Sequence, residues 1–508
     1  MNTFIKTLLL ILFGSYFTFS QVLENYESNF NTLFDKKAKV NPYYFGHNPA
    51  WLKNEVSNEY LDLKSEVNDE TGNFKKFTDP GDIRNYIISA TGKKLIDTTQ
   101  IFRGSFAFQR VENNNWQWLF TRDYATGSPF LIGDSTTGNT RLNGIKMSAE
   151  YAASVIDALD LGFSINYYID DGLKMAHPRP TSKDREINFS TGAAYQISDN
   201  LSLGIQGSVY DNEENIDYSQ DPGALLTEIT LIKFRGYDYP NVFKKTSESR
   251  YTYNNGYSTG INLMFKESSS FTMTAFATGG FNQINVRDGG DSPNPIVEGL
   301  YKNNYLNSGL VSLFKLNNST FLSLLYNLNL SNDWAEFPTF NVLYSKNWFT
   351  EHSLLSGIEY SFNNNLTAGL EAGIKYNSNN FNDYYSIIYA NNKAITLMLN
   401  LGMKINWSNK LASFISAGIN SDKSSNNNLD YSNPSYYFTG YRIKDLYYYQ
   451  SNFNQYLFNL ITAYSPGFGG EFLINLKYAN AIPGNLTPFA NQNRTNSTIA
   501  LEYRVAAY

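Results

Sequence analysis

The chain contains no cysteine. This absence excludes disulfides, a thiolate nucleophile, cysteine-ligated metal and the lipidated cysteine of a lipoprotein. Histidine is also scarce, since only His47, His177 and His352 occur, far apart and in dissimilar sequence contexts. A Ser–His hydrolase needs a histidine within hydrogen-bond reach of its nucleophile. The acidic stretch 211–221 lacks the glycine and the final glutamate of an EF-hand loop. We therefore predict that the protein is not an enzyme and holds no cofactor and no metal ion.

Long apolar runs are missing too. No segment approaches the roughly 18 uninterrupted apolar residues that a transmembrane helix requires. Lys6 followed by the apolar stretch 8–13 is instead typical of a secretory signal. We predict a signal peptide over residues 1–20, so that Gln21 is the first mature residue and the chain is exported.

Charge of one sign is not in large excess, because the net charge is −6 and the pI is ≈ 5.3. Neither nucleic acid nor an anionic membrane surface is therefore indicated as a partner. Aromatic residues are abundant, with 39 Tyr and 36 Phe among 508 residues. Such a content suits the aromatic girdles of a membrane barrel, and the alternative is an aromatic-rich soluble core.

The chief positive feature is a strict alternation of apolar and polar residues in segments of about ten, separated by turn residues. In residues 366–377, Leu366, Leu370 and Ile374 share one face with Ala368, whereas the other face carries Glu371 among small and polar residues. This pattern predicts an all-β fold, a transmembrane antiparallel up-and-down β-barrel in the bacterial outer membrane, surrounded by its lipids.

Turn signals set the expected number of strands. Short turns are predicted at 112–115, 157–158, 199–200, 267–270, 317–318, 363–365, 408–409 and 466–467. Long polar segments between them predict extracellular loops at 125–139, 171–184, 212–249, 287–304, 332–350, 378–392, 421–444 and 479–495.

A first strand near 59–67 and a closing strand at 497–507 complete about 18 strands, with 14 or 16 as alternatives. The barrel is therefore predicted over residues 59–508, with short periplasmic turns and both termini in the periplasm. Tyr508 closes the last strand, which resembles the signal read by the barrel assembly machinery.

The face opposite the apolar one should line the lumen. Charged residues of both signs belong to this set, so a strongly charge-selective pore is not predicted. They either pair to hold the shape of the wall or form a solute site. The lumen-lining candidates are Arg103, Lys146, Glu150, Glu186, Glu359, Glu371, Lys375, Lys404, Glu471, Lys477, Glu502 and Arg504.

Three stretches resemble an uncharacterised family of Gram-negative outer-membrane β-barrel proteins, a domain of unknown function that covers nearly the whole mature chain. These stretches are 104–110 with Trp116 and Trp118, then 128–138, then Pro178-Arg-Pro180. The chain departs from the family pattern at His177, where an acidic residue is expected, and at Asn139, where a glycine is expected. The resemblance implies the barrel and its location, but no chemistry.

A second, shorter motif is Asn48-Pro49-Ala50 followed by Trp51. It resembles the Asn-Pro-Ala turn near the N-terminal hatch of long-chain fatty-acid transporter barrels. That resemblance implies that residues 21–58 form a small plug in the lumen, with Phe45 and Trp51 packed against the wall. The alternative is a periplasmic segment in which an ordinary Asn-Pro turn leads into the first strand.

Two functions remain open at this point. The first is a channel or a passive or gated transporter for a small polar solute. The second is a non-transporting structural or accessory barrel whose extracellular loops bind a neighbouring receptor, lipoprotein or secretion component. An energy-coupled transporter is not favoured, because about 22 strands plus a plug domain exceed the available length.

Overall fold

The computed structural model describes residues 30, 33–34, 39–55, 59–122, 127–218, 228–236, 238, 240–267, 270–289, 295–432, 434–466, 469–484 and 488–506. The predicted signal peptide and Tyr508 lie outside these residues.

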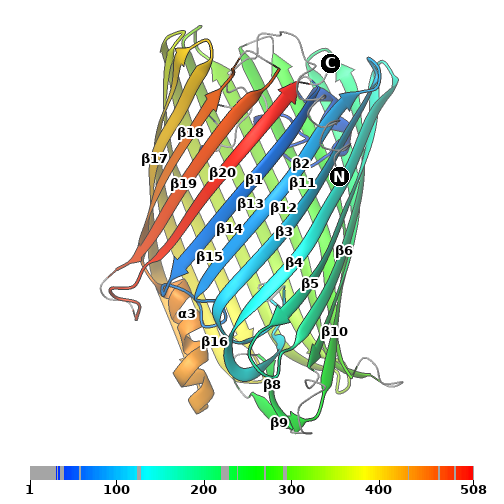
Figure 1. The fold of residues 1–508 in the computed structure, drawn as a ribbon, viewed down its shortest axis with the longest axis vertical. Helices are drawn as coiled ribbons and strands as arrows, with labels where there is room; N and C mark the ends of the chain where they lie inside the picture. The colour runs from blue at the N-terminus through cyan, green and yellow to red at the C-terminus, as the bar shows by residue number, and fades with distance from the viewer. Residues whose placement is uncertain are drawn as a thin grey trace, which may run out of the picture.

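The fold class predicted from the alternation is confirmed. The strands form a closed antiparallel ring of 18, in which the last strand pairs with the first from Tyr60↔Ala506 to Gly72↔Arg494 (Figure 1). Closure leaves no unpaired edge, which a β-protein in lipid requires. The first half of the ring consists of β1 (Tyr60–Gly72), β2 (Asp82–Leu95), β3 (Gln100–Leu119), β4 (Phe130–Ile156), β5 (Leu159–Lys174), β6 (Thr181–Ser198), β7 (Leu201–Tyr218), β10 (Glu248–Glu267) and β11 (Phe271–Asp288).

The ring continues in chain order back to β1. Its second half consists of β12 (Ile296–Lys315), β13 (Thr320–Phe337), β14 (Val342–Asn363), β15 (Leu366–Asp383), β16 (Ile388–Ser408), β17 (Leu411–Tyr431), β18 (Phe453–Tyr464), β19 (Glu471–Pro483) and β20 (Arg494–Ala506).

In β7 the outer face is apolar only toward the short turns, whereas in β5 exposed apolar side chains continue to Leu173 at the other end. In β7 the outward side chains Leu203, Ile205 and Val209 are exposed, and they are followed on the same face by Asp211 and Glu213. A membrane-crossing strand needs about 9–11 residues, whereas β4 has 27. The longer strands of the ring, such as β4 and β7, therefore project beyond the length needed to cross the lipid.

This projection corrects the predicted long loops. The expected loop over 332–350 is reduced to 338–341, because β13 runs on to Phe337 and β14 begins at Val342. The expected loop over 378–392 is likewise reduced to 384–387. Beyond the lipid both faces of a strand meet water, so the ladder continues after the apolar alternation has ended.

One short turn was also predicted wrongly. Residues 112–115 do not form a turn but lie within β3, where the pairing with β4 shifts between Asn113 and Trp116. The asparagines there accommodate a β-bulge, and Asn115 has φ 52°. The connection from β2 to β3 is at 96–99, where Asp97 accepts a hydrogen bond from the Thr99 amide at 2.6 Å. The predicted turns at 157–158, 199–200 and 317–318 fall between consecutive strands, and those at 363–365 and 408–409 begin on the last residue of a strand. The predicted turns at 267–270 and 466–467 include residues outside the described ones.

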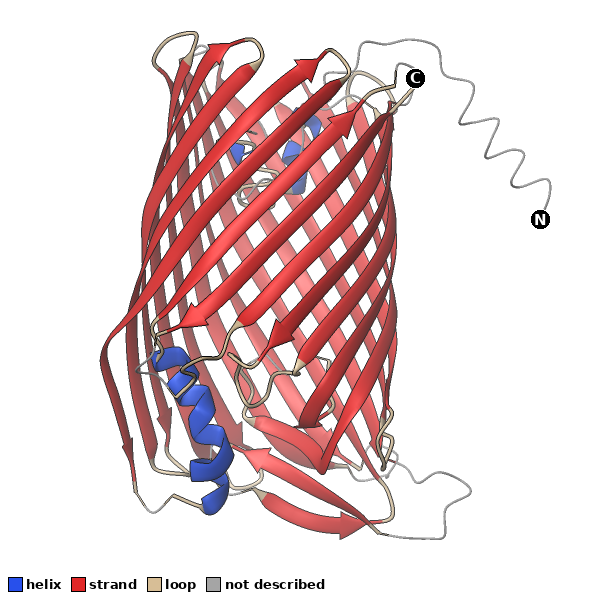
Figure 2. Cartoon of the chain, turned by 60° about the vertical axis from the view of Figure 1, so that its left-hand side comes forward, coloured by secondary structure: helices blue, strands red, loops and turns tan. Residues whose placement is uncertain are grey.

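The end opposite the short turns, here called the loop end, carries additional elements. The hairpin of β8 (Ile229–Arg235) and β9 (Asn241–Lys245) pairs through β8 with the first residues of β4. The π-helical turn η2 (Phe438–Arg442) and α3 (Ile443–Gln450) lie at this end too (Figure 2). Among the described residues, no helix is long and apolar enough to cross a membrane.

Candidate functional site

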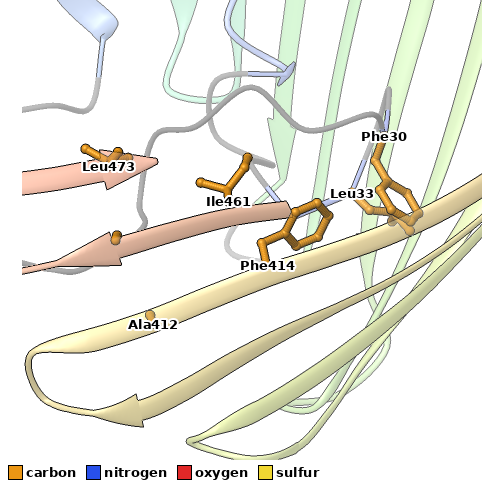
Figure 3. Packing of buried hydrophobic residues seen from close by; sticks show 7 residues of the cluster. Phe30, Leu33, Ala412, Phe414, Ile461 and Leu473 are labelled. Atoms are coloured by element: carbon orange, nitrogen blue, oxygen red, sulfur yellow. The ribbon is translucent and has the colours of Figure 1, made fainter. Parts of the chain in front are cut away.

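The described residues 30, 33–34 and 39–55, here called the N-terminal segment, lie against the inner wall near the short turns, where Figure 2 shows helical turns inside the barrel. Phe30 and Leu33 share a buried cluster with Phe414 of β17 (Figure 3). The ring centroids of Phe30 and Phe414 are 6.0 Å apart. Further along, Phe45 packs edge-on against Phe276 of β11 at 4.9 Å. The segment therefore contacts the wall on opposite halves of the ring.

Asn48 is the most extensively bonded residue of the segment. Its Nδ2 donates to the Ile205 carbonyl at 3.1 Å and to Asn262 Oδ1 at 3.0 Å. Its Oδ1 accepts from the Ala50 amide at 3.0 Å, which caps the 3₁₀ helix η1 (Pro49–Asn54). A short polar cap followed by proline is a favoured start for a helix. The Asn-Pro motif thus folds locally into a capped turn that is fully buried against the wall.

The wall opposite this turn is built of glycines on three adjacent strands. A Cβ on Gly162 of β5 would lie 2.5 Å from the Ala50 nitrogen, and one on Gly204 of β7 would lie 2.8 Å from Trp51 Nε1. A Cβ on Gly192 of β6 would overlap Asn48 Oδ1. Only glycine permits so close an approach. We call this three-strand recess the glycine notch.

Tyr43 connects the segment to two of the charged residues predicted to face the lumen. The phenol of Tyr43 donates to Glu150 and accepts from Arg103 at 2.6 Å. Burial raises the pKa of the Tyr43 phenol well above its usual value, partly offset by Arg103. The phenol therefore stays protonated at physiological pH and remains a donor to the carboxylate.

The structure places the twelve predicted lumen residues on inward strand positions, but it does not bring them together. Several have local partners: Glu359 accepts from the Phe34 amide at 2.9 Å, Lys375 pairs with Glu351 at 3.3 Å, and Arg504 pairs with Glu502 at 3.0 Å. The others are spread around the wall on different strands. Their contacts are Arg103–Glu150 (3.9 Å), Glu186–Arg122 (3.3 Å), Glu371–Asn400 (3.3 Å) and Lys146 over the Tyr168 ring (5.0 Å). Lys404, Glu471 and Lys477 also occupy inward positions.

The loop end holds a second group of inward side chains, which the sequence did not single out. We call residues 73–81, 116–122, 127–134, 228–236 and 434–450 the cap. Its segments contact one another across the mouth of the barrel.

An aromatic stack joins the cap segments. Tyr437 stacks on Trp118 at 5.2 Å and on Phe234 at 5.3 Å. Phe77 packs edge-on against Trp118 at 5.4 Å, and its amide donates to Asp445 Oδ1 at 2.6 Å. Four segments distant in sequence are therefore held in one cluster.

Arg122 anchors the cap to the inner wall. Its guanidinium contacts Asp184, lies 3.5 Å from Asp170 and 3.3 Å from Glu186, and sits over the Tyr168 ring at 3.9 Å. The side chains of Asp170 and Asp184 are fully buried. A buried carboxylate needs such a partner, because desolvation of an unpaired charge is costly.

A second anchor lies further around the ring, on β10, β11 and β12. Lys233 and Arg235 of β8 donate to Glu298 at 2.8 and 2.6 Å. Arg250 bridges Asp288 at 2.6 Å and the Phe130 carbonyl at 3.2 Å. These ion pairs, together with the bond from Arg250 to the Phe130 carbonyl, join the cap to the wall.

A chamber remains between the N-terminal segment and the cap. Along β12, Phe45 of the segment meets Gly309 and Phe130 of the cap meets Gly299. These ten residues correspond to about 34 Å along the strand, or about 26 Å along the axis at a tilt near 40°. The chamber contains a cavity of ≈ 360 Å³ lined by Asn188, Ser208, Tyr210, Asn282, Asn303 and Tyr305.

Catalytic chemistry has little geometric support. Residues 256–260 form the Gly-x-Ser-x-Gly pattern found in hydrolases. The pattern lies within β10, whereas a nucleophile elbow is a strand-to-helix turn. Ser258 bonds to Ser208 at 2.7 Å, and His352 bonds to Tyr326 on the outward face at 2.9 Å. Within the described residues, no group of three His, Asp or Glu side chains could hold a metal ion.

Comparison with known proteins identifies one family and several barrels of similar fold. The model of a family described as "Family of unknown function (DUF6850)" matches residues 49–504. No curated protein matches the sequence.

Among solved structures, the CymD monoaromatic hydrocarbon channel is 11% identical, with 92% of this chain and 93% of that chain covered and a TM-score of 0.31. A Pseudomonas aeruginosa FadL homologue is 11% identical, with 91% and 93% covered and a TM-score of 0.33. The copper transporter OprC is 8% identical, with 88% and 80% covered and a TM-score of 0.40. These likenesses concern the barrel fold alone.

Proposed function

Because the chain belongs to the family of unknown function DUF6850 and folds as a barrel of the outer-membrane type, we propose that it is a gated conduit for a small polar solute. The predicted signal peptide over residues 1–20 would export it. In such barrels the short turns are periplasmic. The N-terminal segment then forms a periplasmic plug, and the cap faces the outside of the cell.

The chamber between the N-terminal segment and the cap is the observation that carries this proposal. A purely structural barrel needs no cavity between two obstructions. The inner wall carries charges of both signs together with many asparagines and tyrosines, which suits a polar solute. Each obstruction is held by separable contacts, Asn48 at one end and Arg122 at the other. Release of either one would change access to the chamber.

A second candidate, an accessory barrel, is favoured by the β8–β9 hairpin. Within the described part of the chain, β9 pairs with β8 alone, and Val242 is 58% exposed. A free strand edge is a template for pairing with another chain. A neighbouring receptor or lipoprotein would dock on this edge.

Planar-bilayer conductance of the mature protein and of a variant lacking residues 21–55 tests the proposal. The wild type should show low or intermittent conductance, and the deletion should raise it because the plug is gone. Heat-modifiable electrophoretic mobility controls for folding of the barrel. If both proteins are ion-tight and a partner copurifies only while β9 is intact, the conduit is excluded and the accessory barrel is supported.

A further inference from the structure

Two inward glycines lie against side chains that line the cavity in the chamber. Gly256 of β10 lies beside Asn282, since a Cβ there would come within 2.7 Å of Asn282 Oδ1. Gly280 of β11 lies under the ring of Tyr305, and a Cβ there would overlap that ring. The aromatic ring of Tyr305 is therefore packed directly on the backbone of Gly280, in the space that a side chain would occupy.

Two side-chain amide oxygens near the cavity accept no hydrogen bond from the protein. Asn282 Oδ1 and Asn254 Oδ1 are buried and have no hydrogen-bond partner. Asn254 is only 6% exposed, and its Nδ2 lies 3.4 Å from the hydroxyl of Tyr210, which lines the cavity. A buried amide oxygen left without a donor costs free energy. Asn282, which lines the cavity, therefore has an amide oxygen whose acceptor capacity the protein leaves unused.

The cavity lining is uncharged. Among the described residues, its wall consists of asparagine, serine, tyrosine, glycine and one phenylalanine. Asp333, the carboxylate that Asn303 reaches, is also bonded by Asn347 at 3.1 Å. An anionic ligand would lose its hydration with no cationic side chain in the lining to compensate. A fully apolar ligand would bury the unpaired amides.

We propose that this cavity binds a neutral saccharide. Tyrosine rings offer flat apolar faces for the C–H surface of a sugar ring, and the amide and hydroxyl groups match its hydroxyls in donors and acceptors. The volume of ≈ 360 Å³ lies within the usual range for small-ligand sites of about 300–1,000 Å³. The inference rests on the proposed conduit, because it names the class of solute that the chamber admits.

Isothermal titration calorimetry of the full-length mature barrel in detergent tests the site with maltose, glucose and glucuronate. Maltose and glucose should bind, and glucuronate should bind at least about tenfold more weakly because its carboxylate finds no partner. Asn282→Ala should weaken maltose binding by about fivefold or more. Gly280→Ala should do the same by displacing Tyr305.

Matched controls exist for both variants. Asn475 also faces inward with an unpartnered Oδ1, but on β19, and Gly279 has no atom nearer than 3.8 Å to an added Cβ. Asn475→Ala and Gly279→Ala should bind maltose within about twofold of the wild type. Equal losses in Asn282→Ala and Asn475→Ala, or no binding of either neutral sugar, would overturn the inference.

Liposome swelling in maltose separates this inference from the proposed function. Swelling without calorimetric binding would support the conduit and remove the saccharide site. Binding that depends on Asn282, with no swelling even after deletion of residues 21–55, would support the site and remove the conduit.

Discussion

The side-chain amide of Asn48 donates to the carboxamide oxygen of Asn262 at 3.0 Å, and this bond joins the N-terminal segment to the inner wall of β10. The two residues are 214 positions apart. Asn48 is completely buried, so its contacts are not exchanged for water while the segment stays in place.

Asn48→Ala should loosen the N-terminal segment. The change removes the bonds to Ile205 and Asn262 and the cap of η1, and an unsatisfied buried group costs about 1–3 kcal/mol. Hydrogen exchange of residues 41–54 should quicken, and bilayer conductance should rise. His47→Asn is the control, because His47 is exposed with φ 59° and asparagine tolerates that conformation. Unchanged exchange in Asn48→Ala would show that Asn48 does not hold the segment.

Gly192→Ala should displace the N-terminal segment from the glycine notch. The added Cβ overlaps Asn48 Oδ1 and approaches Pro49 Cδ at 3.2 Å. Gly207→Ala, on the neighbouring strand, meets nothing nearer than 3.8 Å and should behave like the wild type. Single-channel recording should therefore show more frequent openings in Gly192→Ala alone. Equal behaviour of the two variants would contradict the steric argument.

Arg122→Ala should release one side of the cap. It leaves the buried carboxylates of Asp170 and Asp184 without their cation, and breaking a buried pair costs about 3–5 kcal/mol. Chymotrypsin should then cleave the folded barrel faster near Trp118 and Tyr437. Arg185→Ala provides the comparison, since Arg185 pairs with Glu213 at 3.1 Å but is 52% exposed, and such pairs contribute about 0–1 kcal/mol. Similar cleavage rates in both variants would count against the anchor.

The lipid-facing surface could be predicted from the sequence because it depends on the solvent alone. Leu370 and Ile374 alternate with polar residues because one side of β15 meets lipid. The ends of the strands could not be predicted in the same way, since the ladder of β13 continues through Asn332 and Asp333 to Phe337 in water. The prediction of a turn at 112–115 failed for a related reason, because asparagine suits a bulge as well as a turn.

The candidate site was predictable only where its geometry is local. The Asn-Pro motif predicted a turn, and the residues themselves form it. Gly192 and Asn262, which make the turn a docked element, carry no signal that associates them with Asn48. Arg122 was missed in the same way, because its carboxylate partners are 48 to 64 positions away on other strands.

The central claim is that the N-terminal segment gates the chamber, and a reversible lock on that segment tests it most directly. Ala50 of the segment and Ala194 of β6 belong to one small buried cluster, and the chain has no cysteine of its own. In Ala50→Cys/Ala194→Cys, with bond formation verified by mass, oxidation should abolish bilayer openings and reduction should restore them to the level of the single-cysteine controls. Identical conductance in the oxidised and reduced states would contradict the account.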